Sequence, residues 1–146
     1  MLKFMKMLNN VSRSQAIYRQ NRILAKDLQS GHYAFLLTIC HLPGRSQEEI
    51  ARELCINKST AARNINYLEE AGYIYREVLE NNKRQFSVHP TDKALCILPE
   101  IQKTSREWMD ILSKGISQND LDIFVSVLER METRAREITE IQEANK

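Results

Sequence analysis

The sequence has few of the patterns that mark secreted or membrane proteins. Its three cysteines, Cys40, Cys55 and Cys96, are odd in number and form no C-x-x-C pair, which argues against a disulfide framework and indicates a reducing compartment. No stretch approaches the roughly 20 consecutive apolar residues of a membrane span. Lys3 and Lys6 interrupt the apolar N-terminus, so no signal-peptide core forms. We therefore expect a cytoplasmic protein without a membrane partner.

Motifs for catalysis are also missing. The chain has no glycine-rich phosphate loop, no nucleophile elbow and no HExxH. The paired carboxylates Glu48-Glu49 and Glu69-Glu70 fall on predicted exposed helix faces, where solvation is far more common than acid-base chemistry. Cys40-His41 and His32 could suggest a metal sensor, but neighbours on a helix point about 100° apart and zinc sites show tighter repeats. We predict no enzyme, no cofactor and no metal ligand.

Composition limits the chain to one core. With 146 residues, 42% of them hydrophobic, it can bury one proper core but not two independent domains. The formal net charge is only +2, yet Lys and Arg outnumber Asp and Glu by six to one in residues 1–42. Residues 43–93 balance at eight against eight, and residues 94–146 carry seven against ten. The basic N-terminal part could therefore add to a positive field for a polyanion.

Two short capped helices follow one another after position 45. Ser46 and Glu49 form a Ser-x-x-Glu capping box, in which each side chain satisfies an amide at the helix start. Asn57 is a good N-cap, so a second helix is expected from Lys58 to about Ala71. Gly72 suits the left-handed geometry found just beyond a helix end. The pattern predicts a helix-turn-helix.

The second predicted helix has two different sides. At 100° per residue, Ala61, Ile65 and Leu68 lie together and form a small apolar face. The opposite side carries hydroxyl, guanidinium, amide and phenol groups, which can reach base edges or phosphates in a major groove wide enough for a helix. The predicted DNA-binding residues of this segment are Lys58, Ser59, Thr60, Arg63, Asn66 and Tyr67.

A β-hairpin is predicted directly after these helices. Segments 73–79 and 85–88 are β-prone, and the residues between them favour a turn. A lone hairpin is marginal in water, so its apolar residues are expected to pack on the two helices. These residues are Ile74, Val78, Phe86 and Val88. Lys83 and Arg84 lie at or beside the tip, which would then be a basic finger of the kind that enters a minor groove.

These segments resemble the MarR-type (multiple antibiotic resistance regulator) winged helix-turn-helix family. The matching residues are Ser46 to Ala51, Lys58-Ser59-Thr60 with Arg63, Leu68 to Ile74 with Arg76, and Arg84. The resemblance implies that the helix after Asn57 is the recognition helix and that Arg84 reaches the minor groove. Two departures stand out: Asn82-Lys83-Arg84 replaces the usual Asp-x-Arg, which leaves the arginine without an acidic brace, and His89-Pro90-Thr91 replaces Leu-Thr.

Long helices are predicted on both sides of this segment. One runs from Leu2 to Ser30 and ends at Gly31, and a short apolar helix from His32 to His41 should lie beneath the helix-turn-helix. Thr91 can cap a helix from Asp92 to about Lys114, continuous but kinked at Pro99. A further helix restarts at Ser117. A long helix at a chain end has little of its own domain to cover it, so a second subunit is its natural partner.

The fold class is therefore mainly α with a small β-hairpin wing. We expect a single unit, residues 1–146, in which 1–31 and 92–146 form a helical dimerisation region and 32–91 the winged helix-turn-helix DNA-binding region. The expected function is that of a homodimeric, sequence-specific transcriptional regulator of double-stranded DNA, a repressor released by a small, aromatic or phenolic ligand. Two recognition helices related by a two-fold axis would read a pseudopalindromic operator.

Other interpretations stay open. The resemblance places an effector between the dimerisation helices and the winged unit, where His32, Tyr33 and Leu36 are candidate ligand contacts, although cap and core roles explain His32 and Tyr33 equally well. A redox- or metal-responsive regulator of the same fold is one alternative. The three cysteines have apolar neighbours in the sequence, however, and are expected to be inert. The other alternative, a winged-helix protein-interaction module without sequence-specific DNA binding, is favoured by the neutral balance of residues 43–93.

Overall fold

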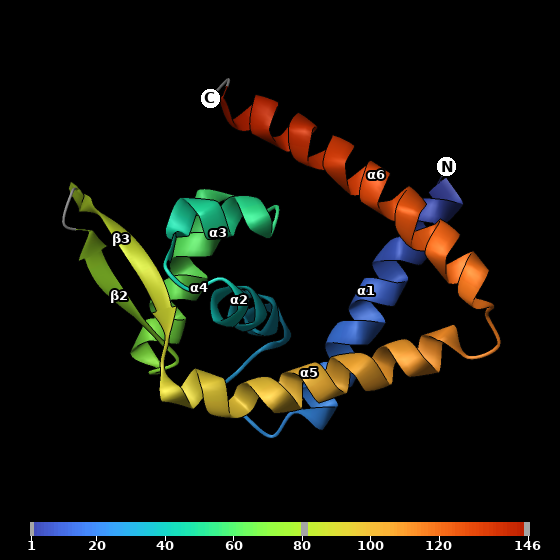
Figure 1. Ribbon diagram of the computed structural model, residues 1–146, viewed down its shortest axis with the longest axis horizontal. Coiled ribbons are helices and arrows are strands. Elements are labelled where there is room, and N and C mark those ends of the chain that lie inside the picture. Colours follow the sequence, from blue (N-terminus) through green and yellow to red (C-terminus); the bar gives the residue numbers. More distant parts are fainter. Residues whose placement is uncertain (1, 80–81, 145–146) are drawn as a thin grey trace. The chain divides into compact units, whose positions relative to one another are not determined.

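The computed structural model of the protein describes the backbone of residues 2–79 and 82–144 and the side chains of residues 2–78 and 85–139. The elements in chain order are α1 (Leu2–Arg22), α2 (Ser30–His41), β1 (Arg45–Ser46), α3 (Gln47–Glu53), α4 (Lys58–Glu70), β2 (Ile74–Leu79), β3 (Asn82–Pro90), α5 (Asp92–Ser113) and α6 (Gln118–Ala144). This order confirms the predicted mainly α class with a small sheet (Figure 1). Contacts divide the chain into Met1–Trp108 and Met109–Lys146.

The core of the first unit forms around α2. Tyr33, Leu36 and Ile39 on this helix are at most 1% exposed, which agrees with the short apolar helix expected there. The other buried apolar residues lie on α2, the connector before it, α3, α4, the base of the β2–β3 hairpin and α5: Ile23, Leu28, Phe35, Ile50, Ala51, Ala61, Ile65, Leu68, Tyr73, Ile74, Val88, Ala94 and Ile101. Since α3, α4, the base of the sheet and the first half of α5 share this core, their relative positions are fixed by packing.

The two predicted caps of the helix-turn-helix are present. The Glu49 amide donates to Ser46 Oγ at 3.2 Å, and the Ser46 amide donates to Glu49 Oε2 at 2.8 Å. The Thr60 amide donates to Asn57 Oδ1 at 2.8 Å and starts α4. Between the helices the chain reverses through Cys55, which has a positive φ of 52°. This left-handed conformation was not predicted, because cysteine is not a residue type that favours a positive φ.

The wing is a three-stranded sheet instead of the expected two-stranded ribbon. The strand order is β1-β3-β2, with Arg45 opposite Val88 in the first pair and Arg76 opposite Val88 in the second. Two residues are too short a segment for the period of a strand to be visible in a sequence, so β1 was missed. It anchors the base of the hairpin to the start of α3.

The packing expected for the hairpin is correct for only half of its apolar residues. Ile74 and Val88 are buried at 2% and 1%, but Val78 and Phe86 are 55% and 44% exposed. All four lie on one face, because alternate residues of paired strands point the same way. The prediction is wrong for Val78 and Phe86 because the core reaches only the base of the hairpin, whereas this cross-strand pair lies farther along it.

The N-terminal helix is shorter than predicted. α1 ends at Arg22 instead of Ser30, and Gly31 lies in the first turn of α2 instead of ending the N-terminal helix. The connector between them inserts Ile23 and Leu28 into the core, five positions apart, a spacing that one helical face does not provide. Burial of both residues therefore favours an irregular segment over a continued helix.

α5 begins as expected and continues through Pro99. Thr91 Oγ1 accepts from the Ala94 amide at 3.4 Å and donates to the Gly72 carbonyl at 2.7 Å, so the same residue starts α5 and ties it to the end of α4. The helix is continuous, as predicted.

The second unit contains the end of α5 and the long helix α6. Ser117 Oγ accepts from the Asp120 amide at 3.2 Å, which confirms the predicted helix start there. Large apolar side chains stay exposed along α6: Ile123, Phe124, Val125, Val127, Met131 and Ile138. None of the described helices combines the length and apolarity needed to cross a membrane.

Candidate nucleic-acid interface

α4 has the two-sided character that its sequence predicts. Ala61, Ile65 and Leu68 are 0% exposed and fix one side of the helix to the core. On the other side Ser59, Arg63 and Asn66 are exposed, and Thr60 is partly so. This exposed polar stripe is built from side chains with donors and acceptors and can be approached from solvent. It is the candidate interface.

The N-terminus of α4 is held by Asn57 and Glu48. Asn57 Oδ1 accepts from the Thr60 amide and from Ser59 Oγ, both at 2.8 Å. Lys58 Nζ lies 3.0 Å from Glu48 Oε1, with both side chains largely exposed. The first turn is therefore capped, but the cation at its start is shared with a carboxylate of α3.

Arg63 has a different environment. Its Nη2 donates to Thr60 Oγ1 at 3.4 Å, one turn back on the same helix. Among the residues that the structure describes, no carboxylate forms an ion pair with Arg63. Arg63 is exposed on the side of α4 that the sequence predicts, and its contact with DNA stays a prediction.

Asn66 is linked to the wing. Nη2 of Arg76, on β2, donates a hydrogen bond to Asn66 Oδ1. Nη1 of the same guanidinium donates to Glu69 Oε2 at 2.8 Å. Arg76 was noted in the sequence as a family match, without any contact to the predicted DNA-binding residues. Its contacts brace the C-terminal half of α4 against the start of the hairpin.

Tyr67 contacts the connector between α1 and α2. Its hydroxyl donates to the Asp27 carbonyl, and its ring stacks on His32 with centroids 4.5 Å apart. Tyr73 Oη and Lys93 Nζ donate to the two carboxylate oxygens of Asp27, at 2.9 and 3.0 Å. These hydrogen bonds, with that from Lys93 first, hold the pKa of Asp27 below its usual range.

The role of Asp27 could not be recognised in the sequence, because its partners lie 40 to 66 residues away along the chain. The sequence carries one hint of this connector. The helical spacing of apolar residues is interrupted between Tyr18 and Leu24, and α1 ends at Arg22 within that interval. The cluster ties α4, the start of β2 and the start of α5 to a single connector.

The basic finger of the wing falls partly outside the described residues. Lys83 and Arg84 belong to β3 by backbone, but their side chains lie outside the described part, so their role stays a prediction. At the base of the sheet His89 stacks on Tyr75 and its Nε2 lies 2.9 Å from Ser87 Oγ. The departure from the family pattern at His89 is therefore accommodated within the sheet.

The candidate ligand residues are buried. His32 is 6% exposed, and Tyr33 and Leu36 are 0% exposed. The Gln29 amide donates to His32 Nδ1 at 3.1 Å, which gives His32 the cap role considered in the sequence, and desolvation lowers its pKa. Tyr33 Oη and Arg19 Nε are buried and have no hydrogen-bond partner within the described chain.

A separate open hollow of about 300 Å³ lies beside the next turn of α2. Its lining comes from Leu37, Thr38, His41, Leu42, Glu53 and Gln102. None of the three candidate ligand residues lines it.

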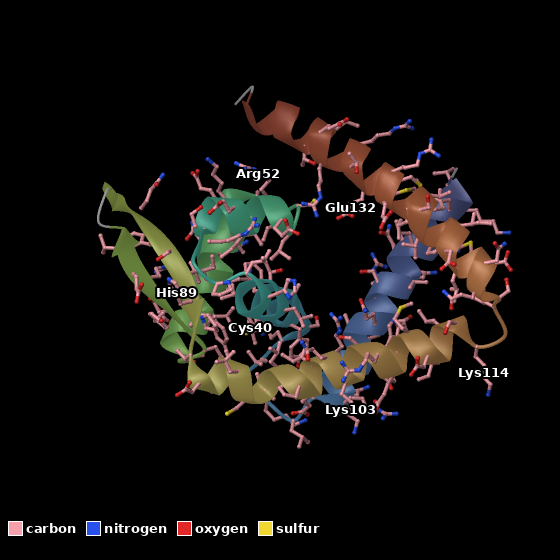
Figure 2. The ribbon with its side chains drawn as sticks, in the orientation of Figure 1. Cys40, Arg52, His89, Lys103, Lys114 and Glu132 are labelled. Carbon is pink, nitrogen blue, oxygen red and sulfur yellow. The ribbon has the colours of Figure 1, made fainter. Side chains whose placement is uncertain are left out.

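The cysteines differ from one another. Cys40 lies on α2, half-buried (Figure 2), and burial raises the pKa of its thiol. Cys55 and Cys96 are exposed. Their apolar neighbours in the sequence therefore do not bury them, and that basis for expecting inert thiols is wrong. The exposure of Cys55 follows from its place in the turn before α4. In the described part of the chain, no three His, Cys, Asp or Glu side chains are grouped to hold a metal ion.

Comparison with known proteins bears directly on this interface. The sequence model of the MarR family matches residues 26–85, which span α2, the helix-turn-helix and the hairpin. This match supports a MarR-type regulator. It is 29% identical over 105 residues, 72% of this chain and 70% of the relative, to the uncharacterized HTH-type transcriptional regulator YybA of Bacillus subtilis strain 168.

Solved MarR structures extend the likeness to the flanking helices. A MarR transcriptional regulator from Methanosarcina mazei Go1 has a TM-score of 0.85 at 28% identity and covers 94% of this chain and 99% of its own. A MarR-family regulator from Listeria monocytogenes complexed with a 26mer DNA has a TM-score of 0.89 at 21% identity and covers 96% of this chain and 93% of its own. The second likeness concerns the fold alone. Together with the family match, the first supports a MarR-type transcriptional regulator.

Proposed function

We propose that this MarR-family regulator binds double-stranded DNA sequence-specifically, with α4 in the major groove and the tip of the β2–β3 hairpin in the adjacent minor groove. The observation that carries the proposal is the two-sided α4, whose apolar side is fully buried while Ser59, Arg63 and Asn66 are exposed. A major groove admits one helix and offers donors and acceptors to such a stripe. Lys58, Thr60 and Tyr67 complete the predicted contacts on α4, and Lys83 and Arg84 those of the wing.

The proposed binding form is a homodimer. The exposed apolar side chains of α6, including Phe124, Val127 and Met131, support this, because burying such a face against a second copy is favourable. We propose residues 1–31 and 92–146 as the dimerisation region and 32–91 as the DNA-binding region. Two copies of α4 would then read half-sites about one helical turn apart in a pseudopalindromic operator.

Repression with release by a small ligand is the proposed regulation. Arg19 Nε and Tyr33 Oη are buried donors without a partner in the described chain, and a buried donor gains from any acceptor that reaches it. A small aromatic or phenolic acid would supply a carboxylate for them. A thermal-shift screen of such acids, followed by DNA release from the stabilised complex, tests this; no stabilisation by any acid would remove the effector from the proposal.

DNA binding itself is tested with duplexes from the promoter region next to the coding sequence. Arg63→Ala should weaken binding to the preferred duplex by about 1 to 3 kcal/mol, about 5- to 150-fold, if Arg63 makes a bidentate base contact. Fluorescence anisotropy over a range of salt concentrations measures this. The matched control is Arg106→Ala, which removes the same charge from an exposed position of α5 and should leave affinity nearly unchanged.

Three results have different meanings. Loss confined to the preferred duplex makes Arg63 a base contact, whereas equal weakening on every duplex makes it a phosphate contact. If micromolar protein does not raise the anisotropy of any duplex, the proposal is contradicted and a protein-interaction module is favoured.

A further inference from the structure

The amide of Asn66 is held in one of its two orientations by Arg76. The guanidinium of Arg76 has only donors, whereas an amide has an acceptor oxygen and a donor nitrogen. The atom that accepts from Arg76 must therefore be Asn66 Oδ1, as the structure has it. Flipping the amide would place its nitrogen donor against a guanidinium donor, so that orientation is excluded while Arg76 is in place.

The brace is anchored at two points. Arg76 Nη1 donates to Glu69 Oε2 at 2.8 Å, and the Arg76 side chain is 22% exposed. A planar guanidinium loses less side-chain freedom per hydrogen bond than a flexible ammonium does. β2 and α4 are both fixed to the core, through Ile74 and Ile65. The guanidinium of Arg76 therefore keeps its position relative to the Asn66 amide.

This arrangement leaves a donor facing outward. With Oδ1 accepting from Arg76, the amide nitrogen of Asn66 donates to no atom of the described residues. Asn66 is exposed and lies three residues after the exposed Arg63, on the same face of α4. A molecule that approaches this face therefore meets a free N–H₂ group beside an oxygen that already accepts from Arg76 and has less acceptor capacity left.

We infer that Asn66 selects guanine over adenine, and that Arg76 is the positioning residue that makes it do so. Asparagine reads adenine by accepting from N6 and donating to N7, which requires both amide atoms. Guanine presents two neighbouring acceptors, N7 and O6, which match a group that only donates. The inference rests on the proposed binding of α4 in the major groove and adds the base class that one of its residues reads.

The test is selection of duplexes from a random pool by the full-length protein, followed by affinity measurements with guanine or adenine at the selected position. The wild-type protein should prefer guanine by about tenfold. Asn66→Asp keeps an acceptor for Arg76 but removes the outward donors, so the preference should disappear without loss of fold. Arg76→Gln frees the amide to flip, so the preference should fall to within about twofold, with adenine newly accepted.

Glu69→Gln is the matched control. It removes the charge of the Glu69–Arg76 ion pair but leaves an acceptor for Nη1 and the contact with Asn66, so the guanine preference should persist. A structural role of Arg76 alone would lower the melting temperature of Arg76→Gln without altering base preference, and that result would overturn the inference. So would uniform weakening by Asn66→Ala on all duplexes.

Different outcomes distinguish failure of the proposed DNA binding from failure of the guanine preference assigned to Asn66. A wild-type protein that enriches no duplex contradicts both the proposed function and this inference. Enrichment of a defined duplex whose guanine preference is unaffected by Asn66→Asp keeps the proposed function and overturns the inference.

Discussion

Exchanging Asn57 for aspartate separates the stability of α4 from its proposed contact with DNA. Asn57 Oδ1 accepts from the Thr60 amide and from Ser59 Oγ, both at 2.8 Å. A carboxylate oxygen at the same place can accept both hydrogen bonds. Aspartate is as good an N-cap as asparagine, and a negative charge at a helix N-terminus is favourable by roughly 0.3 to 1 kcal/mol. Asn57→Asp should therefore fold as stably as the wild type, or slightly more so.

Binding to DNA should nevertheless weaken. In the proposed complex the N-terminal turn of α4, with Lys58 and Thr60, lies close to the phosphate backbone. Two like charges roughly 7 Å apart repel by about 0.6 kcal/mol in water and about 2.4 kcal/mol at the lower effective dielectric of a protein surface. The dissociation constant should thus rise by about threefold to about fiftyfold, and the difference from wild type should shrink as salt screens the charges.

Anisotropy titrations at low and high salt, with thermal unfolding of the same samples, measure both quantities. Gln118→Glu is the matched control, because it makes the same amide-to-acid change at the start of α6. Unchanged affinity for Asn57→Asp would refute the placement of α4 on DNA. An equal loss in both variants would show only a general effect of net charge.

Three further outcomes follow from the structure. Ile65→Ala, at a 0% exposed position, should cost about 2 to 5 kcal/mol in urea unfolding, whereas Val78→Ala on the exposed part of the hairpin should stay within about 0.5 kcal/mol. The pKa of Asp27 is lowered, so its ionised form stabilises the fold at pH values above the ordinary aspartate pKa of about 3.9, and this contribution is lost as pH falls through the lowered pKa. The melting temperature of the wild type should therefore fall more steeply than that of Asp27→Asn below about pH 4. Parallel curves of melting temperature against pH for the two proteins would contradict this. Glu48→Gln should release Lys58 and strengthen DNA binding by about threefold at low salt, and weaker binding would show that the ion pair orders the contact.

Local sequence rules predicted the parts of this fold that depend on neighbours in the chain. The caps at Ser46 and Asn57 join residues three apart, a relation that can be recognised in a sequence. The apolar face of α4 repeats every three or four residues, so Ile65 and Leu68 could be assigned to the core. For the same reason Arg63 and Asn66 could be placed on the exposed side.

Long-range contacts account for what was missed. The end of α1 at Arg22 depends on burial of Ile23 and Leu28 in a core built by other elements, and helix periodicity contains no information about that core. Likewise, Tyr67 has the spacing of a DNA-facing residue, but its hydroxyl is bound to the Asp27 carbonyl 40 residues earlier. Tyr67 as a residue is 38% exposed, but the donor of its hydroxyl is used by Asp27, so any contact with DNA would need the ring or the acceptor side of the hydroxyl.

The neutral balance of the helix-turn-helix region looked like evidence against DNA binding, and the structure changes the meaning of that number. Glu48 is paired with Lys58 and Glu69 with Arg76, so two of the carboxylates are occupied by cations of the same region. A third, Glu49, accepts from the Ser46 amide at the start of α3, which lowers its pKa. The carboxylates of the two ion pairs repel an approaching phosphate less than free carboxylates would. The electric field of an ion pair falls off faster with distance than that of a single charge. Arg63, which has no carboxylate partner among the described residues, then decides the local sign on the exposed face of α4.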